Sequence, residues 1–99
     1  MEKLDILDHV AIQVKNISES ISWYKSKFKC KIMYEDETWG LLEFSNCKLA
    51  LVTKSQHPPH FAIIDENLKK GDKTTLHRDG SISKYILDCD GNNIEIIKY

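Results

Sequence analysis

The feature that most constrains the fold is that apolar residues follow a helical period in only one stretch of the chain. Elsewhere they fall into short runs, most of which alternate with polar residues as in half-buried strands. Asn16 followed by Glu19 has the spacing of a capping box, so we expect the helix to begin there. One apolar stripe then follows the helical period, at Ile17, Ile21, Tyr24 and Phe28. One helix among many short strands indicates an α+β fold.

The alternating runs predict eight strands. They lie at Asp8–Val14, Lys31–Tyr34, Trp39–Phe44, Lys48–Thr53, His60–Ile64, Lys73–His77, Ser83–Leu87 and Asn93–Ile97. In the first strand we expect the apolar residues Val10, Ile12 and Val14 to face the helix, which leaves His9 and Ala11 on the other face. Asp79-Gly80 is a typical hairpin turn.

The chain divides at Lys54–Pro59, where two prolines stiffen the connection. The first half reads strand, helix, then three strands. The second half repeats this order with its helix truncated, because Asp65–Gly71 is too short for more than a turn. DHVAI and PHFAI open the two halves with the same pattern. We therefore expect a single domain over 1–99, with module one at about 5–54 and module two at about 60–99.

Composition excludes several classes of function. Fourteen basic residues against 15 acidic ones give a net charge of −1, without the basic block that nucleic-acid binding needs. No apolar run approaches the ~18 residues of a membrane span. The first ten residues are acidic where a signal peptide would be basic and apolar. We therefore expect a cytoplasmic protein without nucleic-acid or membrane partners.

Chemistry-bearing side chains share faces with small residues on three of the predicted strands. His9 lies on the face of Ala11, and His60 on the face of Ala62. If both strands lie beside the last one, Glu95 joins the two imidazoles. Two histidines and one carboxylate form the facial triad of non-haem iron sites, which Mn, Zn or Ni can also occupy. Taken singly, each histidine also fits as an ordinary hydrogen-bonded strand residue.

Three segments carry a resemblance to a known superfamily. They are LDHVAIQVKNISESISWYKSKFKCKI, HPPHFAI and HRDGSISKYILDCDGNNIEII, and they cover about half the chain. In these segments the chain resembles the vicinal oxygen chelate superfamily, which includes glyoxalase I, extradiol dioxygenases, and fosfomycin- and bleomycin-resistance proteins. The last segment departs from the family pattern at Cys89, where proline is usual.

The resemblance implies a glyoxalase-like fold of paired βαβββ modules, the second with a truncated helix. Its metal positions fall on His9, His60 and Glu95, which would hold a divalent ion such as Fe, Mn, Zn, Ni or Co. The fourth position falls on Ala50, where glyoxalase I has a glutamate ligand. The three-ligand set of extradiol dioxygenases and fosfomycin transferases is what remains. The fosfomycin transferases have a threonine at the position of Ala11, so this chain departs from them there.

The catalytic residues stay open. Tyr85 matches a tyrosine that contacts substrate in the fosfomycin proteins, and it fits equally well in a core. Glu43, in LLEFS, is a candidate base or a solvated strand residue. Arg78 could hold an anionic substrate or be an ordinary turn residue. His57 and His77 could supply an acid, but neither is matched by the family pattern and neither is assigned to the metal.

The sequence thus favours a small glyoxalase-like metalloprotein. We expect a divalent-metal-dependent enzyme of lyase, isomerase, transferase or dioxygenase type, which acts on a small oxygenated substrate. The alternative is a metal-free protein that binds or sequesters a small molecule, as bleomycin-resistance proteins do. The missing helix would leave Phe61 and Ile63 partly uncovered, so we also expect a homodimer.

Overall fold

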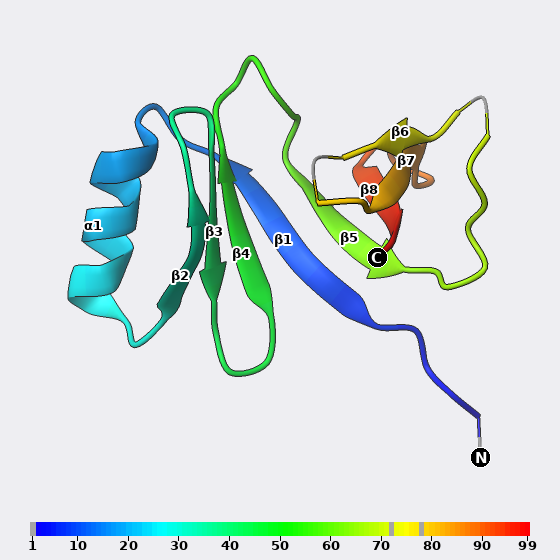
Figure 1. Ribbon diagram of the computed structural model, residues 1–99, viewed down its shortest axis with the longest axis horizontal. Helices are drawn as coiled ribbons and strands as arrows, with labels where there is room; N and C mark the ends of the chain where they lie inside the picture. The colour runs from blue at the N-terminus through cyan, green and yellow to red at the C-terminus, as the bar shows by residue number, and fades with distance from the viewer. Residues whose placement is uncertain (1, 72, 78) are drawn as a thin grey trace. The chain divides into compact units, whose positions relative to one another are not determined.

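The computed structural model describes residues 2–71, 73–77 and 79–99 (Figure 1). Within these residues the chain forms one α-helix and eight β-strands. The chain divides into two compact units. One unit is His9–Pro59, and the other combines the chain up to Asp8 with His60–Tyr99. None of the described helices is long and apolar enough to cross a membrane.

The unit His9–Pro59 has the βαβββ order expected for module one (Figure 1). Its strands lie in the order β2-β3-β4-β1, and β1 runs parallel to β4 while the other neighbours are antiparallel. The first two residues of β1 belong to the other unit. The elements are β1 (Leu7–Gln13), α1 (Ile17–Lys27), β2 (Lys31–Glu35), β3 (Trp39–Glu43) and β4 (Lys48–Val52).

Helix α1 begins and ends for local reasons that the sequence already contains. The side chain of Asn16 accepts a hydrogen bond from the Glu19 amide at 2.8 Å, as the capping box predicts. Ile17 and Ile21 are buried in the hydrophobic core of this unit, against β3 and β4. Phe28 lies just beyond the helix and is exposed, so the predicted stripe ends earlier than expected.

Strand register assigns the two faces of this sheet. Ala11 pairs with Ala50, and Ile12 with Leu51. Ile12 packs with the helical core, as predicted, so Ala11 and Ala50 lie on the face opposite α1. The expected burial of Val10 is wrong, because the core that α1 builds does not include it and its side chain is 41% exposed.

The other unit is a four-stranded sheet in the order β5-β8-β7-β6, with β5 parallel to β8. The first residues of the chain join it, since the Ile64 amide donates to the Ile6 carbonyl at 3.1 Å. The Tyr99 hydroxyl also donates to the Asp8 carboxylate. The strands are β5 (His60–Ile64), β6 (Thr75–Leu76), β7 (Ile82–Leu87) and β8 (Asn93–Lys98).

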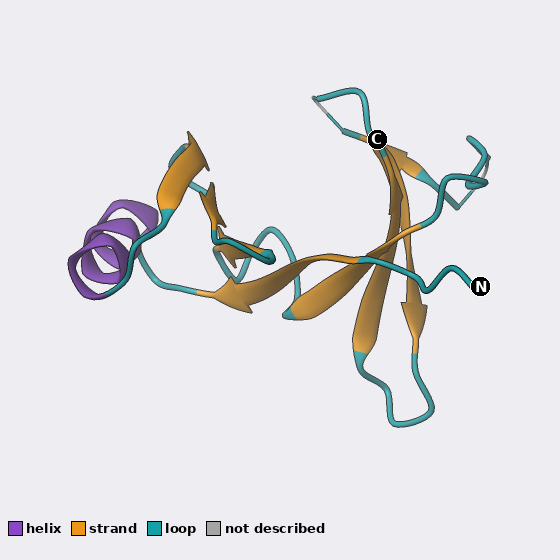
Figure 2. Ribbon diagram, turned by 90° about the horizontal axis from the view of Figure 1, so that it is seen from below, coloured by secondary structure: helices purple, strands orange, loops and turns teal. Residues whose placement is uncertain are grey.

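The truncated helix of module two is confirmed: none of the described residues between β5 and β6 is helical (Figure 2). Strand β6 is shorter than the predicted Lys73–His77, because Thr74 closes a turn. Its amide donates to the Gly71 carbonyl at 3.1 Å, and its hydroxyl accepts from the Gly71 amide at 2.9 Å. The predicted hairpin at Asp79-Gly80 is present, with Gly80 at a φ of 87°.

Register in this unit places Ala62, Glu95 and Tyr85 side by side on one face. We call it the polar face, because Ser83 and His77 lie on it as well. The opposite face, which we call the apolar face, carries seven large apolar residues and two lysines: Phe61, Ile63, Leu76, Ile82, Ile86, Ile94 and Ile96, with Lys84 and Lys98.

Close packing of Gly40 against α1 gives a first prediction. A Cβ atom at this position would lie 3.0 Å from Ile21 Cδ1 and 3.1 Å from Ile17 Cγ2. Gly40→Val should therefore lower the free energy of unfolding in urea by about 1–3 kcal/mol through overpacking. Gly71→Ala is the control and should be within about 1 kcal/mol of the wild type, because its Cβ would be 3.9 Å from the nearest atom. Equal stabilities for Gly40→Val and the wild type would contradict this packing.

The turn between β2 and β3 gives a second prediction. The Asp36 carboxylate accepts from the amides of Thr38 and Trp39, each at 2.8 Å, and from the Tyr34 hydroxyl at 2.5 Å. Asp36→Ala should cost about 1–2 kcal/mol of unfolding free energy at neutral pH. Glu37→Ala, in the same turn, should cost less than about 0.5 kcal/mol.

Acid should reduce the difference in unfolding free energy between the wild type and Asp36→Ala. The Tyr34 hydroxyl, followed by the Thr38 amide, lowers the pKa of Asp36 from its ordinary value of 3.8 to about 2. A lowered folded-state pKa stabilises above the unfolded value, and this contribution is lost as pH falls from about 4 towards 2. The gap in unfolding free energy between the wild type and Asp36→Ala should therefore narrow at about pH 2.5. A gap of constant size from neutral to acid pH would refute the role given to the carboxylate.

Candidate metal centre

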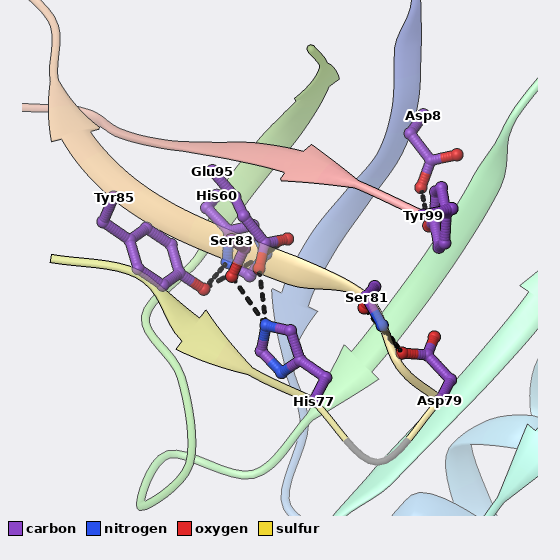
Figure 3. Close-up of polar contacts among 9 residues, drawn as sticks. All are labelled: Asp8, His60, His77, Asp79, Ser81, Ser83, Tyr85, Glu95 and Tyr99. Carbon is purple, nitrogen blue, oxygen red and sulfur yellow. Dashed lines mark hydrogen bonds and ion pairs between the residues drawn. The ribbon is translucent and has the colours of Figure 1, made fainter. Parts of the chain in front are cut away.

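A buried carboxylate lies at the middle of the polar face (Figure 3). Glu95 is on β8, between β5 and β7, and only 6% of its side chain is exposed. Its Oε1 atom lies 3.5 Å from His60 Nε2, and its Oε2 atom lies 3.9 Å from His77 Nε2. Each oxygen of the carboxylate therefore faces an imidazole nitrogen.

His60 approaches Glu95 from the neighbouring strand. It is the first residue of β5, directly after Pro58 and Pro59, and 4% of its side chain is exposed. Ala62 follows on the same face, pairs with Glu95 and has no side chain beyond Cβ. The structure therefore brings together two of the three predicted metal ligands, His60 and Glu95.

Tyr85 lies beside the same pair, on β7. Its hydroxyl is 3.3 Å from His60 Nδ1, and the two rings meet edge to face with centroids 5.1 Å apart. Burial, followed by the negative charge of Glu95, raises the pKa of Tyr85, so the phenol keeps its proton at neutral pH. Tyr85 is thus a partly exposed hydroxyl at the site, and not the core residue that the sequence also allowed.

His77 and Ser83 are neighbours of Glu95 that sequence reasoning did not assign to the site. The Nε2 atom of His77 lies 2.6 Å from the Ser83 hydroxyl. The sequence feature that could have placed His77 near Ser83 is the Asp79-Gly80 turn. This turn sets His77 opposite Ser81, and Ser83 is the next residue on the same face of that strand. Without a family match for His77, the sequence left its role open.

His9 belongs to the other unit and is its first residue. It is buried, lies on β1 and shares the face of Ala11, opposite α1. The residue before it, Asp8, belongs to the unit of His60 and Glu95, where its carboxylate accepts a hydrogen bond from the Tyr99 hydroxyl. Its membership of the predicted metal site stays a prediction.

Ala50 and Glu43, the other positions singled out in module one, have different surroundings. Ala50 is buried and pairs with Ala11, so this point of the sheet offers no ligand atom. Glu43 is exposed at the end of β3, in register with Lys31 on one side and Lys48 on the other. These surroundings are those of a solvated strand residue.

Glu43 also lines a shallow hollow of about 620 Å³, together with lysines and phenylalanines near the end of α1. In the same unit, the backbone carbonyl of His57 accepts a hydrogen bond from the Gln13 side chain. Arg78 lies outside the described residues.

The spacing of His60 and Glu95 fits a metal ion. Nitrogen and oxygen ligands lie about 2.0–2.2 Å from zinc, so two ligands of one tetrahedral ion are about 3.4 Å apart. The observed separation of 3.5 Å agrees with this, whereas it is long for a direct hydrogen bond between charged partners. A buried imidazole beside a buried carboxylate is also a donor set that divalent transition metals prefer.

Solved structures show the fold to which this arrangement belongs. No protein-family model and no curated protein sequence matches the chain significantly. A hypothetical protein from Bacillus halodurans C-125 is similar in structure, with a TM-score of 0.78, 17% identity, and coverage of 98% of this chain and 96% of that one.

Two methylmalonyl-CoA epimerases are also similar in structure. That of Mycobacterium tuberculosis has a TM-score of 0.76 at 18% identity, over 93% of this chain and 86% of its own. That of Streptomyces coelicolor, solved with 2-nitronate-propionyl-CoA, has a TM-score of 0.75 at 14% identity, over 97% of this chain and 98% of its own. The chain therefore has the glyoxalase-like, β-rich α+β fold of these proteins.

Proposed function

We propose that this protein is a divalent-metal-dependent enzyme that acts on a small oxygenated molecule, with His9, His60 and Glu95 as its metal ligands. The observation that carries the proposal is the buried pair of His60 Nε2 and Glu95 Oε1 at the separation of two ligands on one ion. His9 is the third ligand implied by the family resemblance. A bound ion would supply Lewis-acid polarisation of the substrate's oxygens.

The residues of the chain supply the rest of the chemistry. The Tyr85 hydroxyl lies at the edge of the site, 3.3 Å from His60 Nδ1, so it can donate a hydrogen bond to a substrate oxygen that gains negative charge. Ala62 leaves room for a small ligand beside Glu95. Tyr85 is therefore our candidate catalytic residue, in preference to Glu43.

An isomerase is the reaction type that we favour among the four open at the sequence level. Both of the named enzymes described above as similar in structure are epimerases, and that of Streptomyces coelicolor was solved with a CoA-linked ligand. We propose that the substrate carries a carbonyl group with a second oxygen nearby, so that both can approach one ion. The identity of the ion, among Fe, Mn, Zn, Ni and Co, and the cytoplasmic location stay predictions.

Metal binding should raise the thermal stability of the protein. An ion at a hundredfold excess over its dissociation constant adds about 2.7 kcal/mol to the folded state. For a domain of this size, that corresponds to an increase of about 10–20 °C in Tm. We expect this increase with at least one of Mn, Zn, Ni, Co and anaerobic Fe(II), and its loss in His9→Ala, His60→Ala and Glu95→Ala.

The matched control is His57→Ala, which removes a histidine not assigned to the metal and should keep the increase. If the wild type and the three ligand variants respond alike to every ion, the proposed site is wrong. Tight binding of a small molecule by metal-free protein would then support the sequestering alternative.

We also propose that the protein is a homodimer. The apolar face of the unit containing His60 has seven large apolar side chains beside two lysines, and no described residue of this unit is helical. In the other unit, α1 packs on the corresponding face. Ile86, on the apolar face, is 44% exposed. A surface of this kind is typical of an interface between subunits, and a symmetric pair is the commonest assembly.

A single charge should disrupt this contact. We expect sedimentation velocity at tens of micromolar to give a dimer for the wild type and a monomer for Ile86→Lys, because a buried, unpaired ammonium group opposes association. Leu87→Lys, one residue along on the polar face, should remain dimeric. A monomeric wild type, or a dimeric Ile86→Lys, would count against the apolar face as the interface.

A further inference from the structure

We propose that His77 and Ser83 act as a unit that positions the Glu95 carboxylate for metal binding. The inference rests on the proposed function, because it takes Glu95 as a ligand. It adds two residues to the site and gives them a role that differs from ligation: they fix the orientation of a ligand and so set the affinity for the ion.

The two carboxylate oxygens of Glu95 have different neighbours. Oε1 faces His60, the other predicted ligand of this unit, whereas Oε2 faces His77 Nε2 at 3.9 Å (Figure 3). A carboxylate that ligates through one oxygen needs a partner on the other oxygen to keep it from turning about its terminal torsion, which has only a broad preference. His77 Nε2 faces that oxygen at ion-pair range, beyond direct hydrogen-bond distance, so we infer that it acts together with the Ser83 hydroxyl that it contacts.

Ser83 holds His77 in that place. Its hydroxyl is 2.6 Å from His77 Nε2, the same nitrogen that faces Glu95. Ser83 is only 1% exposed and pairs with Thr75 on one side and Ile97 on the other, so its own position is set by the sheet. The His77 side chain is 27% exposed and would have more freedom without this hydrogen bond.

The hairpin turn fixes the backbone on which both residues lie. The His77 amide donates to the Ser81 carbonyl at 2.8 Å, and the Gly80 amide donates back to the His77 carbonyl at 3.0 Å. The Asp79 carboxylate accepts from the amide of Ser81 at 2.9 Å and from its hydroxyl at 2.6 Å. These hydrogen bonds fix the backbone position of His77, from which its ring contacts Ser83 and faces Glu95.

The same contacts argue against a simpler role for His77, that of a metal ligand. A ligand role is less consistent with this geometry, because His77 Nε2 contacts the Ser83 hydroxyl and faces Oε2, whereas the other predicted ligand, His60, faces Oε1. Outer partners of metal ligands commonly change metal affinity by ten- to hundredfold when they are removed.

The test is the affinity for Co²⁺, measured by competition with a chelating dye, together with the visible absorption spectrum of the bound ion. We expect His77→Ala to weaken the affinity by about ten- to hundredfold and to alter the spectrum, because the carboxylate becomes free to rotate. Ser83→Ala should weaken it in the same direction. The double variant should be no worse than His77→Ala, since the two residues act as a unit.

Two further variants separate positioning from other effects. His77→Gln keeps a side-chain N–H near the same place and should recover most of the affinity, which a purely structural role would not predict. His57→Ala should bind Co²⁺ as the wild type does. Circular dichroism of the metal-free proteins checks that each variant is folded, and Ser83→Ala tests the inference if His77→Ala is not.

The outcomes distinguish this inference from the proposed function. If the wild type binds Co²⁺ and Glu95→Ala does not, but His77→Ala and Ser83→Ala bind it as tightly as the wild type, the positioning role is wrong and the metal site stands. If the losses in the double variant are additive, the two residues do not act as a unit. If Glu95→Ala binds Co²⁺ as the wild type does, the metal site itself is wrong, and this inference fails with it.

Discussion

The sheet of the unit containing His60 is organised around the buried carboxyl group of Glu95. An ionised carboxylate removed from water costs several kcal/mol unless nearby groups compensate it. Here the compensation comes from both neighbouring strands, because β8 lies between β5 and β7 and the register places His60 on one side and the hairpin of His77 on the other. Every buried side-chain nitrogen and oxygen among the described residues has a partner. The polar face is thus a complete network around one acid.

The two units differ in what covers the apolar face of their sheets. In His9–Pro59, α1 packs Ile17 and Ile21 onto one face, and Gly40 allows the close approach. In the other unit the described residues of the connection between β5 and β6 are irregular, and the apolar face is not covered by a helix of its own unit. His60, Glu95 and Tyr85 lie on the polar face, so the absence of a helix among the described residues of this unit affects the opposite surface and not these residues.

Similarity of fold here does not extend to similarity of sequence. The compared structures share fewer than one residue in five with this chain, yet they align over nearly all of it. The fold depends on strand pattern and register, which many sequences satisfy, whereas a site depends on particular residues. His60, Glu95 and Tyr85 meet in this structure.

Local patterns in the sequence determined most of the elements. The capping box at Asn16, the period-two runs and the Asp79-Gly80 turn each act through neighbouring residues, so they predicted α1, seven strands to within one residue at each end, and the hairpin. The metal positions His60 and Glu95 followed from face alternation and a family resemblance. Those two residues lie 3.5 Å apart, whereas their role as metal ligands and the place of His9 in the site are still predictions.

Only the tertiary structure decided which side chains meet. The exposure of Val10, the shortening of β6 and the meeting of His77 with Ser83 and Glu95 all depend on packing and register between segments distant in sequence. A strand pattern specifies which face a residue takes, but not which strand lies beside it. The neighbours of Glu95 are distant in sequence: His60 lies 35 residues before it, and His77 lies 18 residues before it. The order of the strands in the sheet brings them together.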